Sequence, residues 1–413
     1  MTTALPTAQE MVGRLGPLRG GWPLDAEEAE RIMAIAAWSV LVEPGDGVAG
    51  RLVSALGPGE ALEHLRDDRL DTALAERVGI TAAELAAAKA RWMPRLEAPA
   101  LRAAVDLAAR ARVRLIVPGD SEWPAALDDL GDHAPLCLWV RGDVGALTRA
   151  EPSVALVGAR AATGYGEHVA MEFGAELAGR GVTVVSGAAY GIDGMAHRAA
   201  LTAGGATVAL LAGGVDRAYP AGHANLLERI VASGAVVSEV PCGGAPTKWR
   251  FLARNRLIAA LGGATVVIEA GWRSGSLNTA GHAATLGRPL GAVPGPVTSA
   301  ASAGCHRLLR EFDARCVTTV DEVMELLGDD TSAVGAATGV GGSRMGAPSA
   351  GEPSAEETRV LDALTSRTWR EAPDVARRAG LAIADVEATL GLLAMEGAVV
   401  RNERGWRRAP IVT

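Results

Sequence analysis

Glycine-rich blocks that also carry guanidinium or hydroxyl groups follow apolar runs in the middle of this chain. The first block is residues 158–166 (GARAATGYG), and the last is residues 272–280 (WRSGSLNTA). Free backbone amides at the start of a helix attract anions, and a neighbouring arginine or hydroxyl adds hydrogen bonds to phosphate oxygens. These residue types therefore predict a surface that binds phosphate groups.

The first block stands where a dinucleotide-binding fold would carry its GxGxxG loop. Arg160 takes the place of the second glycine, whose small size lets a pyrophosphate approach the backbone. A large cation there disfavours a nicotinamide or flavin, so no cofactor is expected. Arg160 beside the amides of a helix start still suits a phosphate. From spacing alone, pairing of Arg160 with a carboxylate of another domain stays open.

The last block places three hydroxyl groups, from Ser274, Ser276 and Thr279, around a predicted helix start. Capping explains one hydroxyl, whereas three together favour an anionic ligand. In the block SGAAYGID, Asp193 is interpreted as the N-cap of the next helix rather than as a catalytic residue. Tyr219, which precedes a proline, is interpreted as an anchor of an ordered loop.

Motifs for the common hydrolytic reactions are absent from the sequence: there is no GxxxxGK[ST], no GxSxG, no HExxH and no DxD-like carboxylate set beside these blocks. The cysteines show no CxxC pair and no ligand spacing with histidine, so neither a metal site nor a disulfide framework is expected. All of them are interpreted as buried thiols: Cys137, Cys242, Cys305 and Cys316. A phosphate-binding surface without a base or metal indicates binding, and the chain is expected not to be an enzyme.

The net charge of −8 at first disfavours a polyanionic partner, but cations can cluster locally. No acidic residue lies between Glu239 and Glu269, and the cations in that window are Lys248, Arg250, Arg254 and Arg256. A local positive field on an acidic protein is one interpretation. Pairing of these cations with carboxylates elsewhere in the fold is the other, and charge alone leaves both open.

The elements that position these blocks are short apolar runs alternating with amphipathic helices. Hydrophobic residues make up 49% of the 413-residue chain and aromatics only 4%, so the cores are expected to consist of Ala, Val and Leu in α/β layers. Buried strands separated by helices predict a doubly wound, mostly parallel sheet, with functional groups just after the strands. The predicted strands are residues 114–117, 136–140, 154–157, 182–186, 207–211, 235–238, 264–269 and 290–293.

Composition and periodicity divide the chain into several predicted parts. These are a loose tail (residues 1–25), a helical domain of SAM or helix-hairpin-helix type (26–110), a doubly wound α/β domain of Rossmann-like type (111–328), a flexible linker rich in Gly, Ala and Ser (329–355) and a winged-helix-like domain (356–413). No long apolar run and no signal-peptide pattern occurs, so the protein is expected in the cytoplasm and not in a membrane.

Taken together, the ordered blocks VGARAATGYG, SGAAYGID, GGVDRAYP, FLARNRLIAAL and EAGWRSGSLNTAGHA resemble the DprA/Smf (DNA processing protein A) family over residues 113–325. The resemblance implies an extended Rossmann-like domain, usually homodimeric. It also implies a protein that binds single-stranded DNA, protects incoming DNA and helps to load the RecA recombinase in natural transformation and recombination.

The resemblance further implies that Arg160 and Lys248 are the principal contacts to the DNA backbone. Phe251 or Trp249 is expected either to stack on a base or to pack in the core. The family often shows Phe-Pro where this chain has Phe251-Leu252, and the segment Asn278 to His282 also departs from its pattern. The full set of expected DNA-binding residues is Gly158, Arg160, Thr163, Tyr165, Gly166, Lys248, Phe251, Arg254, Asn255, Arg256, Ser274, Gly275, Ser276 and Thr279.

Two other functions remain open from the sequence. The glycine-rich anion loop also resembles that of lysine-decarboxylase-like nucleoside monophosphate phosphoribohydrolases, in which case Glu269 would be the catalytic carboxylate. Alternatively, the winged-helix-like part recognises duplex DNA or a protein partner, with contacts from Arg401, Arg404, Arg407 and Arg408.

Overall fold

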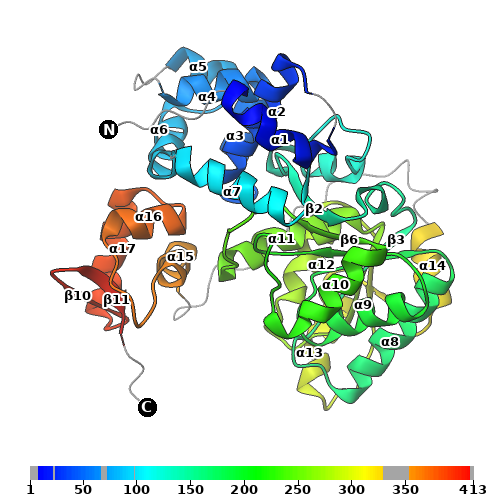
Figure 1. Ribbon diagram of the computed structural model, residues 1–413. Helices are drawn as coiled ribbons and strands as arrows, with labels where there is room; N and C mark the ends of the chain where they lie inside the picture. Colours follow the sequence, from blue (N-terminus) through cyan, green and yellow to red (C-terminus); the bar gives the residue numbers. More distant parts are fainter. Residues whose placement is uncertain (1–7, 22–23, 67–71, 97, 329–352, 410–413) are drawn as a thin grey trace. The chain divides into compact units, whose positions relative to one another are not determined.

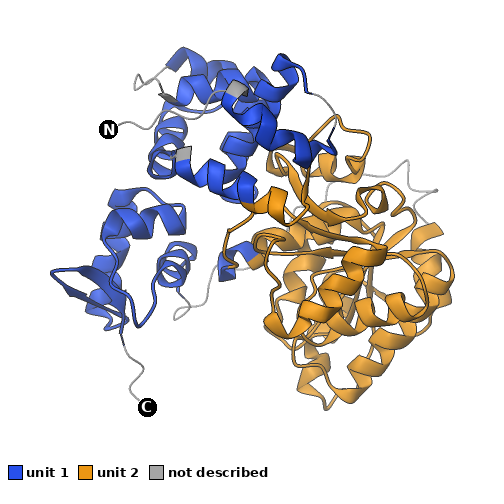
Figure 2. Cartoon of the chain, viewed as in Figure 1, with its two compact units in different colours: residues 1–106, 247–250, 343–413 blue, residues 107–246, 251–342 orange. Residues whose placement is uncertain are grey.

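A computed structural model describes residues 8–21, 24–66, 72–96, 98–328 and 353–409 of the chain (Figure 1). The chain forms two compact units (Figure 2). Unit 1 contains residues 1–106, 247–250 and 343–413, and unit 2 contains residues 107–246 and 251–342. Each unit is described by itself below.

Unit 2 is built on a sheet that, within the described residues, has nine strands in the order β1-β2-β6-β5-β4-β3-β7-β8-β9. Strands β1 and β2 pair antiparallel with each other, and β2 pairs antiparallel with β6, whereas the other neighbours are parallel. The strands are β1 (Arg114–Ile116), β2 (Leu138–Gly142), β3 (Ser153–Gly158), β4 (Thr183–Ser186), β5 (Thr207–Leu210), β6 (Ala235–Ser238), β7 (Ala264–Glu269), β8 (Leu290–Ala292) and β9 (Arg315–Cys316).

Helices cover both faces of this sheet, because alternate side chains of each strand point to opposite faces. In β3, Val154 and Leu156 pack into one core, and Ala155 and Val157 pack into the other. The first core is covered by α8 (Gly164–Gly179), α9 (Ile192–Thr202) and α14 (Val320–Gly328). The second is covered by α11 (Lys248–Leu261), α12 (Ser276–Thr285) and α13 (Ala303–Glu311). The predicted doubly wound α/β fold is confirmed.

Strand β3 lies between β4 and β7, so the chain changes direction at this strand. It runs outward from β3 through β4 and β5 to β6, and it then returns to add β7 and β8 on the other side of β3. Such a switch point separates the two loops that leave neighbouring strands and opens a crevice at their carboxyl ends. The loops after β3 and β7 contain the first and last of the glycine-rich blocks.

Every strand range predicted above overlaps a strand of the described sheet of unit 2, and one strand of that sheet, β9, was not predicted. Strand β9 has two residues, Arg315 and Cys316, and both are exposed, so no apolar run marks it. Its exposure also corrects the expectation that all the cysteines are buried: Cys137, Cys242 and Cys305 are buried, but Cys316 is not.

The N-terminal part of unit 1 is helical, as predicted. Trp38 and Trp92 meet edge to face in its core, with ring centroids 5.3 Å apart. The predicted loose tail is wrong for residues 8–19, which form α1 and a 3-10 turn and bury Met11, Leu15 and Leu18. The elements are α1 (Ala8–Leu15), η1 (Gly16–Arg19), α2 (Ala26–Leu41), α3 (Gly47–Leu56), α4 (Pro58–Arg66), α5 (Thr72–Val78), α6 (Ala82–Trp92), η2 (Met93–Arg95) and α7 (Ala98–Arg110).

The C-terminal part of unit 1 has three helices followed by a hairpin, which is the element order of a winged helix. The elements are α15 (Ala355–Ala363), α16 (Ala372–Ala379), α17 (Ile383–Met395), β10 (Val399–Asn402) and β11 (Gly405–Arg408). They share a core that includes Val360, Val375 and Leu390. Of the predicted linker, residues 329–352 lie outside the described residues.

Among the described helices, none combines the length and the apolar character needed to cross a membrane.

Gly191, in the loop after β4, packs closely against the loop after β3, and a substitution there tests this contact. Its φ is +74°, and a Cβ there would lie 2.2 Å from the carbonyl oxygen of Ala159. We expect Gly191→Ala to lower the free energy of unfolding by roughly 1–3 kcal/mol, because the strained backbone and the close contact both oppose a side chain. Urea unfolding measures the change. The control is Gly179→Ala at the end of α8, where the space is open and stability should be unchanged or slightly higher. Equal stability of the two variants would contradict the prediction.

Candidate functional site

The predicted phosphate-binding blocks leave parallel strands of unit 2 at one edge of the sheet. The first follows β3, the block SGAAYGID follows β4, the block GGVDRAYP follows β5, and the last follows β7. Parallel strands present their carboxyl ends at the same edge, so all of these loops lie there.

Arg160, in the loop after β3, is exposed. Its guanidinium carbon lies 4.7 Å from the ring centroid of Phe251, near the start of α11. Within unit 2, no ion pair of Arg160 occurs among the described residues. A cation held over an aromatic face is directed but stays accessible, because the ring contact leaves the N–H edge of the guanidinium free.

The loop that carries Arg160 is held by Glu269, at the end of β7. The amide of Thr163 donates to Oε2 of Glu269 at 2.8 Å, and the Thr163 hydroxyl donates to Oε1 at 2.7 Å. The amide of Ala159 donates to the Glu269 carbonyl at 2.7 Å. Gly166 allows this arrangement, because a Cβ there would lie 2.5 Å from Oε2 of Glu269. Gly158 allows the close packing of Ile192 in the same way, with a built Cβ 2.5 Å from its Cγ1.

Glu269 was the catalytic candidate of the phosphoribohydrolase hypothesis. Glu269 is only 2% exposed, and both of its carboxylate oxygens accept hydrogen bonds from Thr163. A general acid or base must reach its substrate, and this carboxylate is occupied in fixing a loop. The geometry therefore gives Glu269 a positioning role.

Tyr165, in the first turn of α8, is 45% exposed. Its hydroxyl donates to the carbonyl of Pro294 at 2.7 Å, which ties α8 to the loop after β8. Partial burial raises the pKa of the Tyr165 hydroxyl. The ring face is the accessible part of this residue, whereas its hydroxyl is already bonded.

The cationic helix block differs most from the sequence prediction. Arg254, Asn255 and Arg256 are buried, with 5%, 8% and 5% of their surfaces exposed. The guanidinium of Arg254 donates to the carbonyl of Gly187 at 2.7 Å and also to that of Leu210, so it ties the ends of β4 and β5 together. A Cβ at Gly187 would lie 2.3 Å from Nη1 of Arg254, so the guanidinium fits only against a glycine. Burial lowers the pKa of Arg254 to about 10.

The two neighbours of Arg254 are also occupied within unit 2. The amide of Asn255 donates to the Gly275 carbonyl at 3.3 Å, and Arg256 donates to both oxygens of Glu239 at 2.9 and 2.7 Å. Direct DNA contacts were expected from all three residues of the block, but buried side chains with protein partners cannot make them. They position the loops instead.

Asp193 has a related positioning role. Its Oδ2 accepts hydrogen bonds from the amides of Gly187 and Ala189, at 3.2 and 3.4 Å. The N-cap of α9 is Gly191, so the N-cap prediction for Asp193 is wrong. A buried carboxylate inside the turn after β4 fixes that turn.

The last block forms the N-terminal end of α12. The hydroxyls of Ser274 and Ser276 are 2.8 Å apart, and the N-cap residue, Gly275, is exposed and provides no side-chain cap. Thr279 is only 1% exposed and Ser276 only 7% exposed, so these two lie beneath the surface. Accessible groups here are the half-buried Ser274 and the Gly275 backbone, and the dipole of the helix favours an anion at this end.

Lys248 lies in unit 1, in the first turn of α11, and is exposed. Its backbone amide donates to Oδ2 of Asp362 at 2.6 Å. No hydrogen bond or ion pair to its ammonium group occurs within the described part of the chain. Lys248 therefore retains the accessible cation that the sequence predicts, as does Arg160 in unit 2.

Two exposed tyrosines at the strand exits were not predicted as binding residues. Tyr219, after β5, is 45% exposed, and its ring centroid lies 5.5 Å from that of Phe251. Tyr190, after β4, is 49% exposed and contacts the ring of His223 edge to face. The sequence feature that could have identified them is an aromatic residue inside a glycine-rich loop after a strand. Because Arg160 and Tyr219 both contact the ring of Phe251, these three residues form one cation–aromatic cluster.

Residues 114–328 match the family model of DNA recombination-mediator protein A. A putative DNA processing protein DprA from Mycobacterium tuberculosis is 42% identical over 390 residues, which cover 90% of this chain and 93% of that protein. The protein Smf of Escherichia coli is 41% identical over 51% of this chain and 56% of its own length. The X-ray structure of DNA processing protein A from Streptococcus pneumoniae superposes with a TM-score of 0.57 at 30% identity, covering 70% of this chain and 95% of that one.

Proposed function

The chain belongs to the DNA recombination-mediator protein A family, and on that premise we propose that it binds single-stranded DNA as a non-catalytic protein of the cytoplasm. We further propose that it acts as a homodimer, protects incoming DNA and helps to load the RecA recombinase in natural transformation and recombination. These last roles rest on the sequence resemblance to the family.

The observation that carries the proposal is the cluster of Arg160, Phe251 and Tyr219. Single strands differ from duplexes because their bases are free to stack on protein side chains. A site for them needs cations for the phosphates and aromatic faces for the bases, held close together. Arg160 over Phe251, with Tyr219 beside it, provides both kinds of group at one strand-exit edge.

A second anion-binding element supports the same function. The N-terminal end of α12 has the exposed Gly275 as its N-cap and the Ser274 hydroxyl next to it. Contacts of this kind recognise phosphate without recognising base identity. The proposed interface is therefore tolerant of sequence.

The salt dependence of binding tests the phosphate contacts. Affinity for an oligo-dT strand should fall log-linearly with salt, with a slope of about −0.7 per phosphate contact. Arg160→Ala and Lys248→Ala should each weaken binding and flatten this slope, because each removes one accessible cation. Fluorescence anisotropy over a salt series measures both quantities.

Arg229→Ala is the matched control, because Arg229 is an exposed arginine on α10 (Ala224–Ser233), outside the strand-exit loops. It should leave affinity and slope unchanged. If Arg160→Ala and Lys248→Ala behave like this control, the interface has been placed on the wrong residues.

Base stacking on Tyr219 can be tested separately from charge. Tyr219→Ala should weaken oligo-dT binding by about 1–3 kcal/mol, the usual contribution of one stacked base, with little change in the salt slope. Tyr219→Phe keeps the ring and should bind as the unaltered protein does. An oligonucleotide with abasic sites should bind the Ala variant and the unaltered protein almost equally. An equal loss on the abasic strand would show that the ring does not stack on a base.

A further inference from the structure

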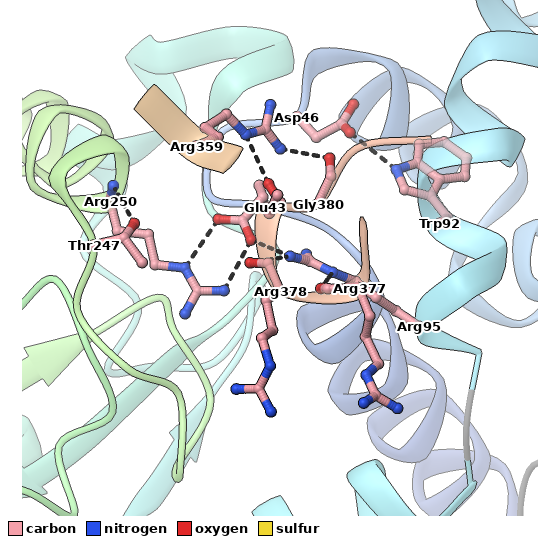
Figure 3. Close-up of polar contacts among 11 residues, drawn as sticks. Glu43, Asp46, Trp92, Arg95, Thr247, Arg250, Arg359, Arg377, Arg378 and Gly380 are labelled. Atoms are coloured by element: carbon pink, nitrogen blue, oxygen red, sulfur yellow. Dashed lines mark hydrogen bonds and ion pairs between the residues drawn. The ribbon is translucent and has the colours of Figure 1, made fainter. Parts of the chain in front are cut away.

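Glu43 joins three separate segments of unit 1 (Figure 3). It follows α2, and only 10% of its side chain is exposed. Arg250 contacts both of its oxygens, with Nε 2.9 Å from Oε2 and one terminal nitrogen 2.8 Å from Oε1. Arg95 also donates to Oε1. One buried carboxylate thus binds an arginine of the N-terminal helices and an arginine of the segment 247–250.

The charges in this cluster depend on one another. Burial by itself would raise the pKa of Glu43, but the guanidinium groups of Arg250 and Arg95 outweigh burial and hold that pKa well below its usual range. The carboxylate is therefore ionised, and a buried ion of this kind is stable only with its partners in place. Loss of the Glu43 charge would remove a buried counter-charge from both Arg95 and Arg250.

The C-terminal part of unit 1 completes the cluster through the end of α16. Nε of Arg95 donates to the carbonyl of Arg377 at 2.6 Å, and Nε of Arg359 donates to that of Ala379 at 2.8 Å. Carbonyls at the end of a helix lack partners within the helix, so these two arginines satisfy them. Gly380 lies directly against the cluster, since a Cβ there would be 2.6 Å from Cγ of Glu43.

The same C-terminal part also contacts the segment that carries Lys248. Asp362, on α15, accepts the hydrogen bond from the backbone amide of Lys248, and its other oxygen lies 3.6 Å from Arg408. The guanidinium of Arg359 lies 5.5 Å from the centroid of a Trp249 ring system. Contacts from two sides therefore hold the first turn of α11: Glu43 holds Arg250, and α15 holds the two residues before it.

We propose that Glu43 is a positioning residue for DNA binding, which through Arg250 fixes the first turn of α11 and so holds the Lys248 ammonium ready for a phosphate. This inference rests on the proposed function. An inhibitory contact would place a carboxylate against the ammonium of Lys248. Asp362 instead binds the backbone amide and leaves the ammonium accessible, which is the arrangement of a helix cap.

The test compares single and double variants of the full-length chain on an oligo-dT strand. Glu43→Gln keeps the shape of the side chain and removes its charge. It should weaken binding by no more than Lys248→Ala does and make the salt slope shallower by about 0.7, the contribution of one phosphate contact. The double variant Glu43→Gln with Lys248→Ala should bind like Lys248→Ala alone, because both changes remove the same contact. Combined with Arg160→Ala, the effects of Glu43→Gln should multiply.

Hydrogen exchange of the amides in residues 247–252 provides a readout that needs no DNA. These amides should exchange faster in Glu43→Gln and stay unchanged in Glu60→Gln, a matched Glu–Arg pair that is exposed on α4. If Glu43→Gln fails to fold, Asp362→Asn tests the same segment from α15, where the carboxylate is only partly buried. Unchanged exchange in Glu43→Gln, or in Asp362→Asn where Glu43→Gln does not fold, would overturn the proposal.

Faster exchange with unaltered DNA affinity in Glu43→Gln, while Lys248→Ala weakens binding, would also overturn the proposal, and so would multiplication of the Glu43 and Lys248 effects. If Arg160→Ala and Lys248→Ala both bind as the unaltered chain does, the proposed function itself fails. The exchange result then reports separately whether Glu43 anchors the segment.

Discussion

The strand-exit edge of unit 2 depends on one buried guanidinium. The carboxyl ends of parallel strands leave carbonyl groups that the sheet no longer pairs, and a buried carbonyl without a donor is costly. Arg254 supplies donors to the carbonyls after β4 and at the end of β5. Asp193 lies close enough to Arg254 to interact with its charge, and it holds the amides of the same turn. Phe251 lies on α11, one turn before Arg254, and its ring contacts Arg160. Because Arg254 anchors α11, it also fixes the position of Phe251.

Periodicity and turn chemistry were sufficient to predict the sheet apart from β9, because the other strands are runs of mostly buried apolar residues flanked by turn residues. The position of Arg160 followed from the same pattern. The sequence pattern did not predict that Arg254, Asn255 and Arg256 of α11 point into the protein. The acceptors of Arg254 are carbonyls 44 and 67 residues away in the chain. The carboxylate that pairs with Arg256 belongs to Glu239, 17 residues away. Carbonyl acceptors carry no sequence signal, so a row of cations on a helix gives no indication of which ones the fold will bury.

Burial of these cations also changes the electrostatic picture of an acidic protein. Of the four cations between Glu239 and Glu269, Arg250 is paired with Glu43, Arg256 with Glu239, and Arg254 is bonded to carbonyls. The cluster that the sequence suggested as a local positive field is mostly neutralised inside the protein. Of these four cations, only Lys248 has an exposed side chain.

A buried ionic cluster is a costly way to join segments of a chain, because well-packed apolar side chains of similar volume are often as stabilising or more so. Its advantage is geometric. Two-point contacts between a guanidinium and a carboxylate tolerate little rotation, whereas apolar contacts allow sliding. Glu43 makes such a two-point contact with Arg250. Arg95 and Arg359 donate to specific backbone carbonyls at the end of α16. Removing any one segment leaves a buried charge or carbonyl unsatisfied, so the N-terminal helices, the segment 247–250 and the end of α16 are held as one arrangement within unit 1.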